Sequence, residues 1–249
     1  MSDLAGKPVL ISGAGRGLGE AIAHELAARG AVVAVCDINE ASAIAVADAI
    51  RAAGGQAHAF GGDLGKRQLF FDVAEAFTKV AGPPYALINN ASVLVYEPIE
   101  KVTEETLEKM LSAGLKSVFW GTQAFLQYGQ GEGGRIINYS SPVAYRGRPN
   151  TSAYAAIKGA IATFTKVMAG ELGPRGIRVN AIAPGSVPTP ATAGFVSAED
   201  FERRAKNIPL RRNGRPDDVA NAVAFLLGPD ADFINGAMLA IDGGIIAAG

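Results

Sequence analysis

Tyr154 and Lys158 form the residue pair in this sequence whose chemistry is easiest to define. They stand four residues apart in the stretch 151–172, where the apolar spacing predicts a helix, so both lie on one face about 6 Å apart along the axis. A free tyrosine has a pKa of about 10, and a nearby ammonium lowers it by favouring the phenolate. Tyr154 can then exchange a proton with an alcohol or carbonyl oxygen. By itself, however, Y-x-x-x-K is a common pattern and usually marks a partly exposed helix pair.

A glycine-rich loop suggests a second chemistry, the binding of a pyrophosphate. Gly13, Gly17 and Gly19 follow the spacing G-x-x-x-G-x-G between an apolar strand-like run, 7–12, and a predicted helix, 17–29. Glycines let the chain turn tightly and approach the phosphates, and the helix N-terminus offers free N–H groups. Many glycine loops are plain turns, but a strand before and a helix after this one favour a dinucleotide site.

Asp37 ends the second apolar run, 31–37, about 18 residues after Gly19. A carboxylate at this place can accept hydrogen bonds from both hydroxyls of an adenosine ribose and repels a 2′-phosphate. The sequence therefore favours NAD as cofactor over NADP. Arg16 is the counter-argument, because a cation in the loop can hold a 2′-phosphate.

The elements that must position these residues alternate along the chain. The strands are continuous apolar runs, as expected when helices cover both faces of a parallel sheet. We expect strands at 7–12, 31–37, 56–60, 86–90, 135–140, 178–183 and 237–242, and helices at 17–29, 39–53, 68–80, 103–127, 151–172 and 216–227. This order predicts one doubly wound, Rossmann-type α/β domain over 1–249, with a parallel sheet of about seven strands. The stretch 184–209 reads as irregular, and a substrate lid is expected around 186–210.

Composition excludes several classes of protein. Of 249 residues, 49% are hydrophobic and 19% charged, with a net charge of −1, which argues against disorder and against binding to nucleic acid or an anionic membrane. Cys36 is the single cysteine and reads as a core residue, and His24 and His58 lack companions for a metal site. With no apolar signal core and no membrane-length apolar run, a cytoplasmic protein is expected.

Further motifs follow in order along the chain: Asp63-Leu64, Asn89-Asn90-Ala91, Tyr154-Ala155-Ala156-Ile157-Lys158, Asn180-Ala181-Ile182-Ala183-Pro184-Gly185 and Asp242-Gly243-Gly244. In their joint order and spacing the sequence resembles the short-chain dehydrogenase/reductase family over about residues 5–245. The resemblance implies an NAD(P)-dependent enzyme that moves a hydride between the nicotinamide and a CH–OH or C=O carbon. It also implies Ser141, Tyr154 and Lys158 as catalytic residues: Ser141 bonds the substrate oxygen, Tyr154 is the general acid/base, and Lys158 holds the nicotinamide ribose.

The same resemblance implies a set of cofactor-binding residues. Asp63 would lie near the adenine, Asn90 and Ala91 along the adenosine ribose, and the residues after 183 around the nicotinamide carboxamide. The full set is Gly13, Arg16, Gly17, Leu18, Gly19, Asp37, Ile38, Asp63, Leu64, Asn90, Ala91, Tyr154, Lys158, Pro184, Gly185, Val187 and Thr189.

Gly114 is the main departure from the family pattern, which has an asparagine in the middle of this helix. The family asparagine supports a kink whose backbone carbonyl holds a water leading to the lysine. Glycine permits a kink and leaves the carbonyl free, so we expect activity to survive, with Ser112 or Ser117 as substitute polar groups. Ser92, where the family often has glycine, is expected to have little effect.

The substrate is poorly specified, beyond being a small molecule such as a secondary alcohol, ketone or sugar-type hydroxyl compound. Expected wall positions are Val93, Tyr96, Pro142, Val143, Tyr145, Ser186, Phe195 and 198–207. The basic residues nearby, Arg146, Arg148, Arg203, Arg204 and Lys206, are more typical of solvated surface charge than of an anion site.

Two other functions stay open on the sequence. One is an enoyl-thioester reductase on the same fold, although such enzymes usually space tyrosine and lysine more widely. The other is a cofactor-binding regulator or scaffold without catalysis, which only Gly114 supports. The family commonly forms tetramers, and the apolar end Ile245-Ile246-Ala247-Ala248-Gly249 suits a buried interface, so a homotetramer is expected.

Overall fold

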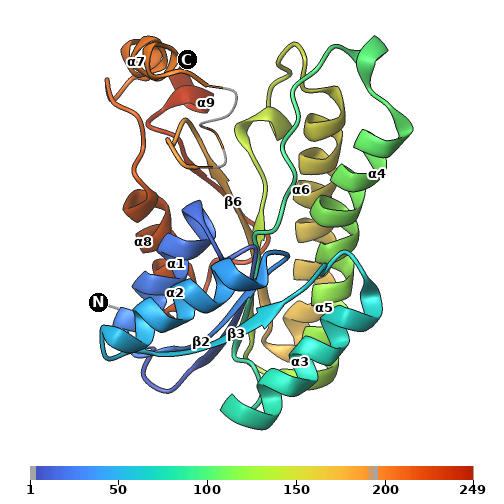
Figure 1. The fold of residues 1–249 in the computed structure, drawn as a ribbon, viewed down its shortest axis with the longest axis vertical. Coiled ribbons are helices and arrows are strands. Elements are labelled where there is room, and N and C mark those ends of the chain that lie inside the picture. The colour runs from blue at the N-terminus through green and yellow to red at the C-terminus, as the bar shows by residue number, and fades with distance from the viewer. Residues whose placement is uncertain (1–3, 191, 193–195, 249) are drawn as a thin grey trace.

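The computed structural model describes residues 4–190, 192 and 196–248, and within these ranges it contains a seven-stranded parallel sheet (Figure 1). The strand order is β3-β2-β1-β4-β5-β6-β7, so the order reverses direction between β1 and β4. The strands are β1 (Pro8–Ser12), β2 (Val32–Asp37), β3 (Gln56–Gly61), β4 (Ala86–Asn89), β5 (Arg135–Tyr139), β6 (Arg178–Pro184) and β7 (Met238–Ile241). The predicted Rossmann-type α/β fold is confirmed.

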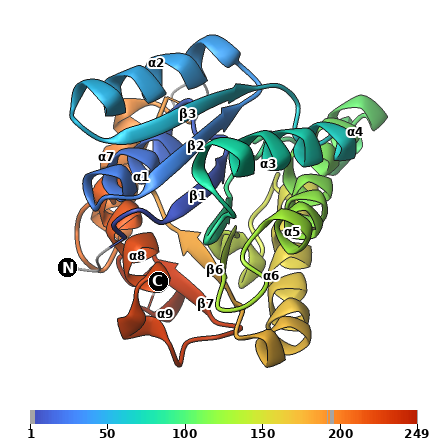
Figure 2. The same ribbon diagram turned by 90° about the horizontal axis from the view of Figure 1, so that it is seen from below.

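Helices cover both faces of the sheet (Figure 2). One face carries α1 (Gly17–Ala28), α2 (Glu40–Ala52) and α8 (Pro216–Leu227), and the other α3 (Arg67–Ala81), α5 (Ser117–Tyr128) and α6 (Ser152–Leu172). Alternate strand residues serve the two cores: Val9 and Ile11 pack in the first, and Leu10 in the second. Because both faces are buried, the strands are apolar without a break.

Short elements complete the described chain. They are the 3₁₀ turns η1 (Ile99–Lys101), η3 (Pro142–Ala144), η4 (Gly173–Arg175) and η5 (Pro229–Ala231), and the helices α4 (Glu104–Leu111), α7 (Ala198–Asn207) and α9 (Ile245–Ala248). Asn39 caps α2, because its side chain accepts a hydrogen bond from the Ser42 N–H at 3.1 Å. Cys36 is a buried core residue, as predicted, and burial raises the pKa of its thiol. Among the residues described, no helix is long and apolar enough to cross a bilayer.

Two sequence predictions need correction. The helix expected over 103–127 is divided by a π-helical turn, η2 (Ser112–Lys116), which lies between α4 and α5. The stretch 184–209 is not wholly irregular, because α7 forms within it. The Ser197 hydroxyl caps α7 by accepting the Asp200 N–H at 3.1 Å, and acidic first-turn and basic last-turn side chains complement the helix dipole. The lid expected around 186–210 stays a prediction.

Candidate active site

The ends of five parallel strands meet at one edge of the sheet and open into a cleft of about 340 Å³. Ligands of doubly wound folds bind outside the carboxyl ends of the strands, where the strand order reverses. The cleft is lined by every residue that the sequence assigned to catalysis or to the cofactor: Gly13, Arg16, Gly17, Leu18, Gly19, Asp37, Ile38, Asp63, Leu64, Asn90, Ala91, Ser141, Tyr154, Lys158, Pro184, Gly185, Val187 and Thr189.

The glycine loop between β1 and α1 leaves room that side chains would fill. A Cβ at Gly19 would lie 2.1 Å from the Gly13 carbonyl oxygen, and one at Gly15 would lie 2.8 Å from the Asp37 carboxyl carbon. Helix geometry leaves the N–H group of Leu18, in the first turn of α1, without an intrahelical acceptor, whereas the Gly17 N–H donates to the Glu20 carboxylate at 3.1 Å. A tight backbone cradle with a free N–H at the start of a helix fits a pyrophosphate.

Asp37 stands beside this cradle with its carboxylate fixed. Oδ2 accepts the Gly15 N–H and Oδ1 accepts the Asn39 N–H, each at 3.0 Å. The neighbouring Ile38 is 74% exposed and gives the cleft an apolar surface next to the carboxylate. Across the cleft, Asp63 is held by accepting the Gly65 N–H at 2.9 Å. An oriented acceptor beside an apolar surface fits a ribose and its base.

Ser12, which the sequence analysis did not single out, joins the glycine loop to the segment after β4. Its hydroxyl oxygen accepts the N–H groups of Asn90 and Ala91, both at 3.1 Å. In return the Asn90 side chain donates to the carbonyls of Ser12 and Gly13, at 3.1 and 2.7 Å. The two loops at the reversal point are thus one hydrogen-bonded unit. The sequence feature that could have indicated this role is a serine at the last position of the first strand.

Helix α6, which carries Tyr154 and Lys158, is tied to the sheet by buried polar side chains. The Ser140 hydroxyl donates to the Lys158 carbonyl at 2.9 Å. The Asn138 side chain donates to the Thr165 hydroxyl at 3.0 Å and accepts from the Asn89 side chain at 2.9 Å. Buried polar groups of this kind fix one arrangement, since any shift leaves them unpaired. These hydrogen bonds therefore fix the position of α6 relative to the end of β5.

Lys158 is almost wholly buried, at 1% exposure. Its Nζ donates to the Tyr139 carbonyl at 2.7 Å and lies 5.6 Å from the ring centres of both Tyr139 and Tyr154. Burial lowers the pKa of Lys158 to about 7. An ammonium has three donors, so the contact with Tyr139 leaves two for groups that enter the cleft.

The expected acidity of Tyr154 is not a property of the protein alone. Burial raises the pKa of the Tyr154 phenol above its usual value, Tyr96 adds to the rise, and hydrogen bonding with Ser141 opposes it. The main reason is that a buried phenolate would lose its hydration. Ser141 follows the end of β5 by two residues, and its hydroxyl lies beside the phenol.

The substrate side of the cleft agrees only in part with the expected walls. Val93, Tyr96 and Ser186 line it, and the Tyr96 ring meets the Tyr154 ring edge to face with centres 5.9 Å apart. Pro142, Val143 and Tyr145 are not lining residues; the Tyr145 hydroxyl donates instead to the Met238 carbonyl at 2.8 Å. Phe195 lies outside the described residues. Ser92, which the sequence marked only as a departure from the family pattern, also lines the cleft. Lining residues that the sequence did not single out are Gly62, Gly65, Leu94, Ala113, Tyr139, Ser140 and Thr192.

The π-helical turn places Gly114 against α6. A Cβ there would lie 3.0 Å from Ile157 Cγ2 and 4.0 Å from the Ser92 hydroxyl. The Ser117 hydroxyl donates to the Ala113 carbonyl at 2.5 Å, so it is engaged within its own helix. A π turn widens the helix by one residue, which is the irregularity that glycine was expected to permit. The hydroxyl nearest the space of the family asparagine belongs to Ser92.

Comparisons with known proteins agree with this geometry. A family model described as enoyl-(acyl carrier protein) reductase matches residues 13–246. An uncharacterized oxidoreductase of Methylorubrum extorquens is 40% identical, covering 98% of this chain and 100% of its own length. A cyclopentanol dehydrogenase of Comamonas sp. is 33% identical and is covered over 97% of both proteins.

Solved structures resemble this chain closely in both fold and sequence. A short chain dehydrogenase from Burkholderia cenocepacia in complex with NADP has a TM-score of 0.92 at 35% identity, with 98% of this chain and 100% of that one covered. A 3-ketoacyl-(acyl-carrier-protein) reductase from Brucella melitensis complexed with NADH has a TM-score of 0.90 at 33% identity, covering 98% and 99%. The chain belongs to the short-chain dehydrogenase/reductase family and is an oxidoreductase that acts on CH–OH and C=O groups.

Proposed function

We propose that this protein is an NAD-dependent oxidoreductase that interconverts a secondary alcohol and a ketone, or a sugar-type hydroxyl and its carbonyl, with Tyr154 as general acid/base. The observation that carries the proposal is that Ser141, Tyr154 and Lys158 lie at one end of a single cleft whose other end holds Asp37. The bound nicotinamide would supply the hydride chemistry.

The chain's own residues would bind the substrate and the cofactor and transfer a proton to or from the substrate oxygen. The Ser141 hydroxyl would hydrogen-bond the substrate oxygen, where charge builds in the transition state. Tyr154 would give its phenolic proton to that oxygen during reduction and take it back during oxidation. Lys158, anchored by the Tyr139 carbonyl, would stabilise the phenolate and hold the nicotinamide ribose.

The preference for NAD rests on Asp37. Its carboxylate is fixed by two backbone N–H groups, so it would accept the ribose hydroxyls and repel a 2′-phosphate. Arg16 lines the same end of the cleft and is the group that would favour NADP. Solved relatives carry NADP or NADH, so this chain's own carboxylate is the stronger argument.

The other cofactor contacts are proposed as the family pattern implies. Asp63 and Leu64 would hold the adenine and Asn90 and Ala91 the adenosine ribose. The nicotinamide carboxamide would lie against Pro184, Gly185, Val187 and Thr189. A homotetramer is proposed as the assembly.

The matched family model is described as an enoyl-(acyl carrier protein) reductase, so that activity is the second candidate. The spacing of Tyr154 and Lys158 opposes it, since four residues place both on one turn of α6 beside Ser141. A scaffold without catalysis is opposed by the same assembled group.

Replacing Tyr154 by Phe tests the proposal. The assay follows NADH and NADPH absorbance over a panel of secondary alcohols, ketones and polyols, with Tyr128→Phe as matched control outside the cleft. We expect Tyr154→Phe to lower turnover by about 100-fold or more while NADH binding stays intact, because only proton transfer is lost. Parental turnover in Tyr154→Phe would refute the role of the phenol. NADH binding without turnover on any substrate would identify a scaffold.

A further inference from the structure

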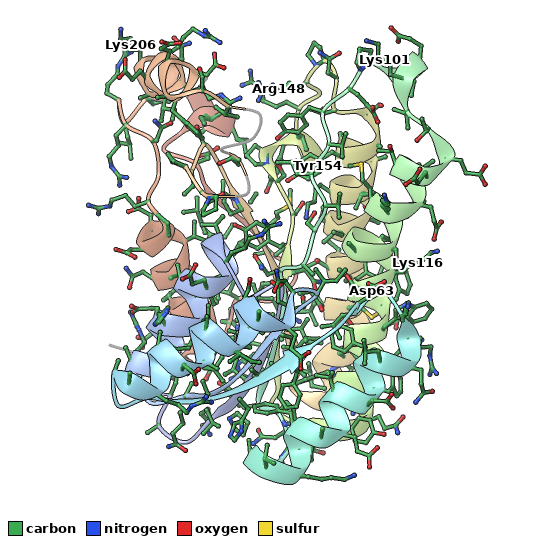
Figure 3. All side chains as sticks on the ribbon, in the orientation of Figure 1. Asp63, Lys101, Lys116, Arg148, Tyr154 and Lys206 are labelled. Carbon is green, nitrogen blue, oxygen red and sulfur yellow. The ribbon has the colours of Figure 1, made fainter. Side chains whose placement is uncertain are left out.

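The charged side chains of the cleft are divided between its two ends. Its carboxylates, Asp37 and Asp63, line the end proposed for adenosine together with Arg16. At the substrate end Arg204 from α7 lines the cleft, and the exposed Arg148, from the segment between η3 and α6, lies near Arg204 without lining the cleft. Figure 3 shows Arg148 above Tyr154, between α7 and the tops of α4 and α6.

Tyr96 connects these cations to the reacting end of the cleft. The Arg148 guanidinium carbon lies 5.8 Å from the centre of the Tyr96 ring, whose edge-to-face contact with Tyr154 spans 5.9 Å between centres. Arg204 lines the cleft together with Tyr96 and Phe201, and its guanidinium carbon lies 5.7 Å from the Phe201 ring centre. Two ring contacts therefore separate Tyr154 from Arg148, and Arg204 faces the same space.

Among the described residues, neither guanidinium has a carboxylate partner. Asp200, the acid nearest to Arg204 on α7, forms its ion pair with Arg203, and Glu97 pairs with neither arginine. Partial burial of Arg204 and, next, the charge of Arg148 lower the pKa of Arg204, whereas Tyr96 and Asp200 raise it, so the two guanidinium groups are close enough to repel each other. An anion that binds between the two guanidinium groups would reduce this repulsion.

We propose that the substrate carries an anionic group, a carboxylate, sulfonate or phosphate, which Arg148 and Arg204 bind while its carbonyl or hydroxyl carbon lies at Tyr154. Planar guanidinium groups present paired N–H donors that match the oxygens of such anions. Tyr96 and Phe201 would pack on the apolar part between the two ends. This inference rests on the proposed function of the same cleft.

The test compares acids with their neutral esters. The probes are 4-carboxybenzaldehyde and its methyl ester, and 4-oxopentanoate and its methyl ester, reduced with NADH. The variants are Arg148→Gln, Arg204→Gln, their combination, and the charge-keeping Arg148→Lys and Arg204→Lys. Lys206→Gln is the matched control, because this exposed lysine on α7 does not line the cleft. NADH affinity and circular dichroism verify folding of each variant.

We expect the parent to prefer each acid over its ester by about tenfold or more in kcat/KM, the usual effect of a charge-assisted hydrogen bond. Either Gln variant should lose most of that preference, and Lys206→Gln should keep it. The Lys variants retain the charge but not the paired N–H donors, so they should keep more of the preference than the Gln variants, and high salt should reduce it. Equal rates for acid and ester in the parent, or a preference that survives the double Gln variant, would overturn the anion site and leave the proposed function intact.

Calorimetric titration of both acids and esters into the protein separates the two proposals. If no probe is turned over, the proposed function fails for these carbonyl compounds, but binding still decides the anion site. Acid binding that disappears in the double Gln variant supports the site. Acids that bind no more tightly than their esters overturn it.

Discussion

Lys158→Met should make the stability of this protein less dependent on pH. Burial lowers the pKa of Lys158 from 10.5 to about 7, and its Nζ is bonded to a carbonyl, not to a carboxylate. The unfolded chain therefore binds more protons than the folded chain between about pH 7 and pH 10.5. Stability must rise with pH in that window and is reduced by the full cost of the buried charge below it.

The size of the effect follows from the shift. One pKa unit corresponds to about 1.4 kcal/mol, so the Lys158 contribution to the free energy of unfolding should rise by about 2 kcal/mol from pH 7 to pH 9. Methionine has similar length and no charge, so the variant lacks this rise. Tyr139 and Tyr154 have raised pKa values, so their ionisation affects the free energy of unfolding only above about pH 10, outside the range from pH 7 to pH 9.

The measurement is urea unfolding of parent and variant at half-unit steps from pH 6.5 to pH 9, without nicotinamide. The difference in free energy of unfolding, parent minus Lys158→Met, should increase by about 2 kcal/mol from pH 7 to pH 9. Lys101→Met, a change at an exposed lysine, should give a constant difference. A constant difference for Lys158→Met as well would show that this ammonium is not destabilised by burial, and the reasoning on the site would fail.

Two further substitutions test the cofactor end and the π turn. Asp37→Asn should raise the ratio of NADP to NAD in kcat/KM by about tenfold, because it removes the charge that repels a 2′-phosphate; an unchanged ratio in steady-state assays would assign the preference to another residue. Gly114→Asn should lower the free energy of unfolding by about 1 kcal/mol, because its Cβ would lie 3.0 Å from Ile157 Cγ2, and should not raise turnover. A large gain in turnover over a nearly inactive parent would show that the glycine breaks a proton relay.

The sequence predicts most of the fold because each parallel strand is a continuous apolar run. Val9, Leu10 and Ile11 are all apolar since alternate residues enter different cores. The site follows from the fold, because parallel strands end at one edge and the motif residues after β1, β2, β4, β5 and β6 must meet there. The order of the motifs along the chain is thus enough to predict which residues lie together in the cleft.

What the sequence misses depends on contacts between distant segments. Helix α7 has only Ala198, Phe201 and Ala205 as apolar residues at helical spacing, which is a weak sign, and the Ser197 cap and the order of its charges mark it as well. The π turn at Gly114 lies close to Ile157 of α6, a residue far along the chain. Arg148 and Arg204 read as surface charge until the fold brings them to Tyr96.

Burial moves the pKa values of Tyr154 and Lys158 in opposite directions, and both shifts favour the uncharged forms. The protein's own groups therefore do not favour a phenolate–ammonium pair near neutral pH. Hydroxyl groups that accept from the two remaining Lys158 donors would favour its ammonium, and a positive charge beside the phenol would favour its phenolate. Proton transfer by Tyr154 is then coupled to occupancy of the cleft, since the groups that enter it restore the charges that burial suppresses.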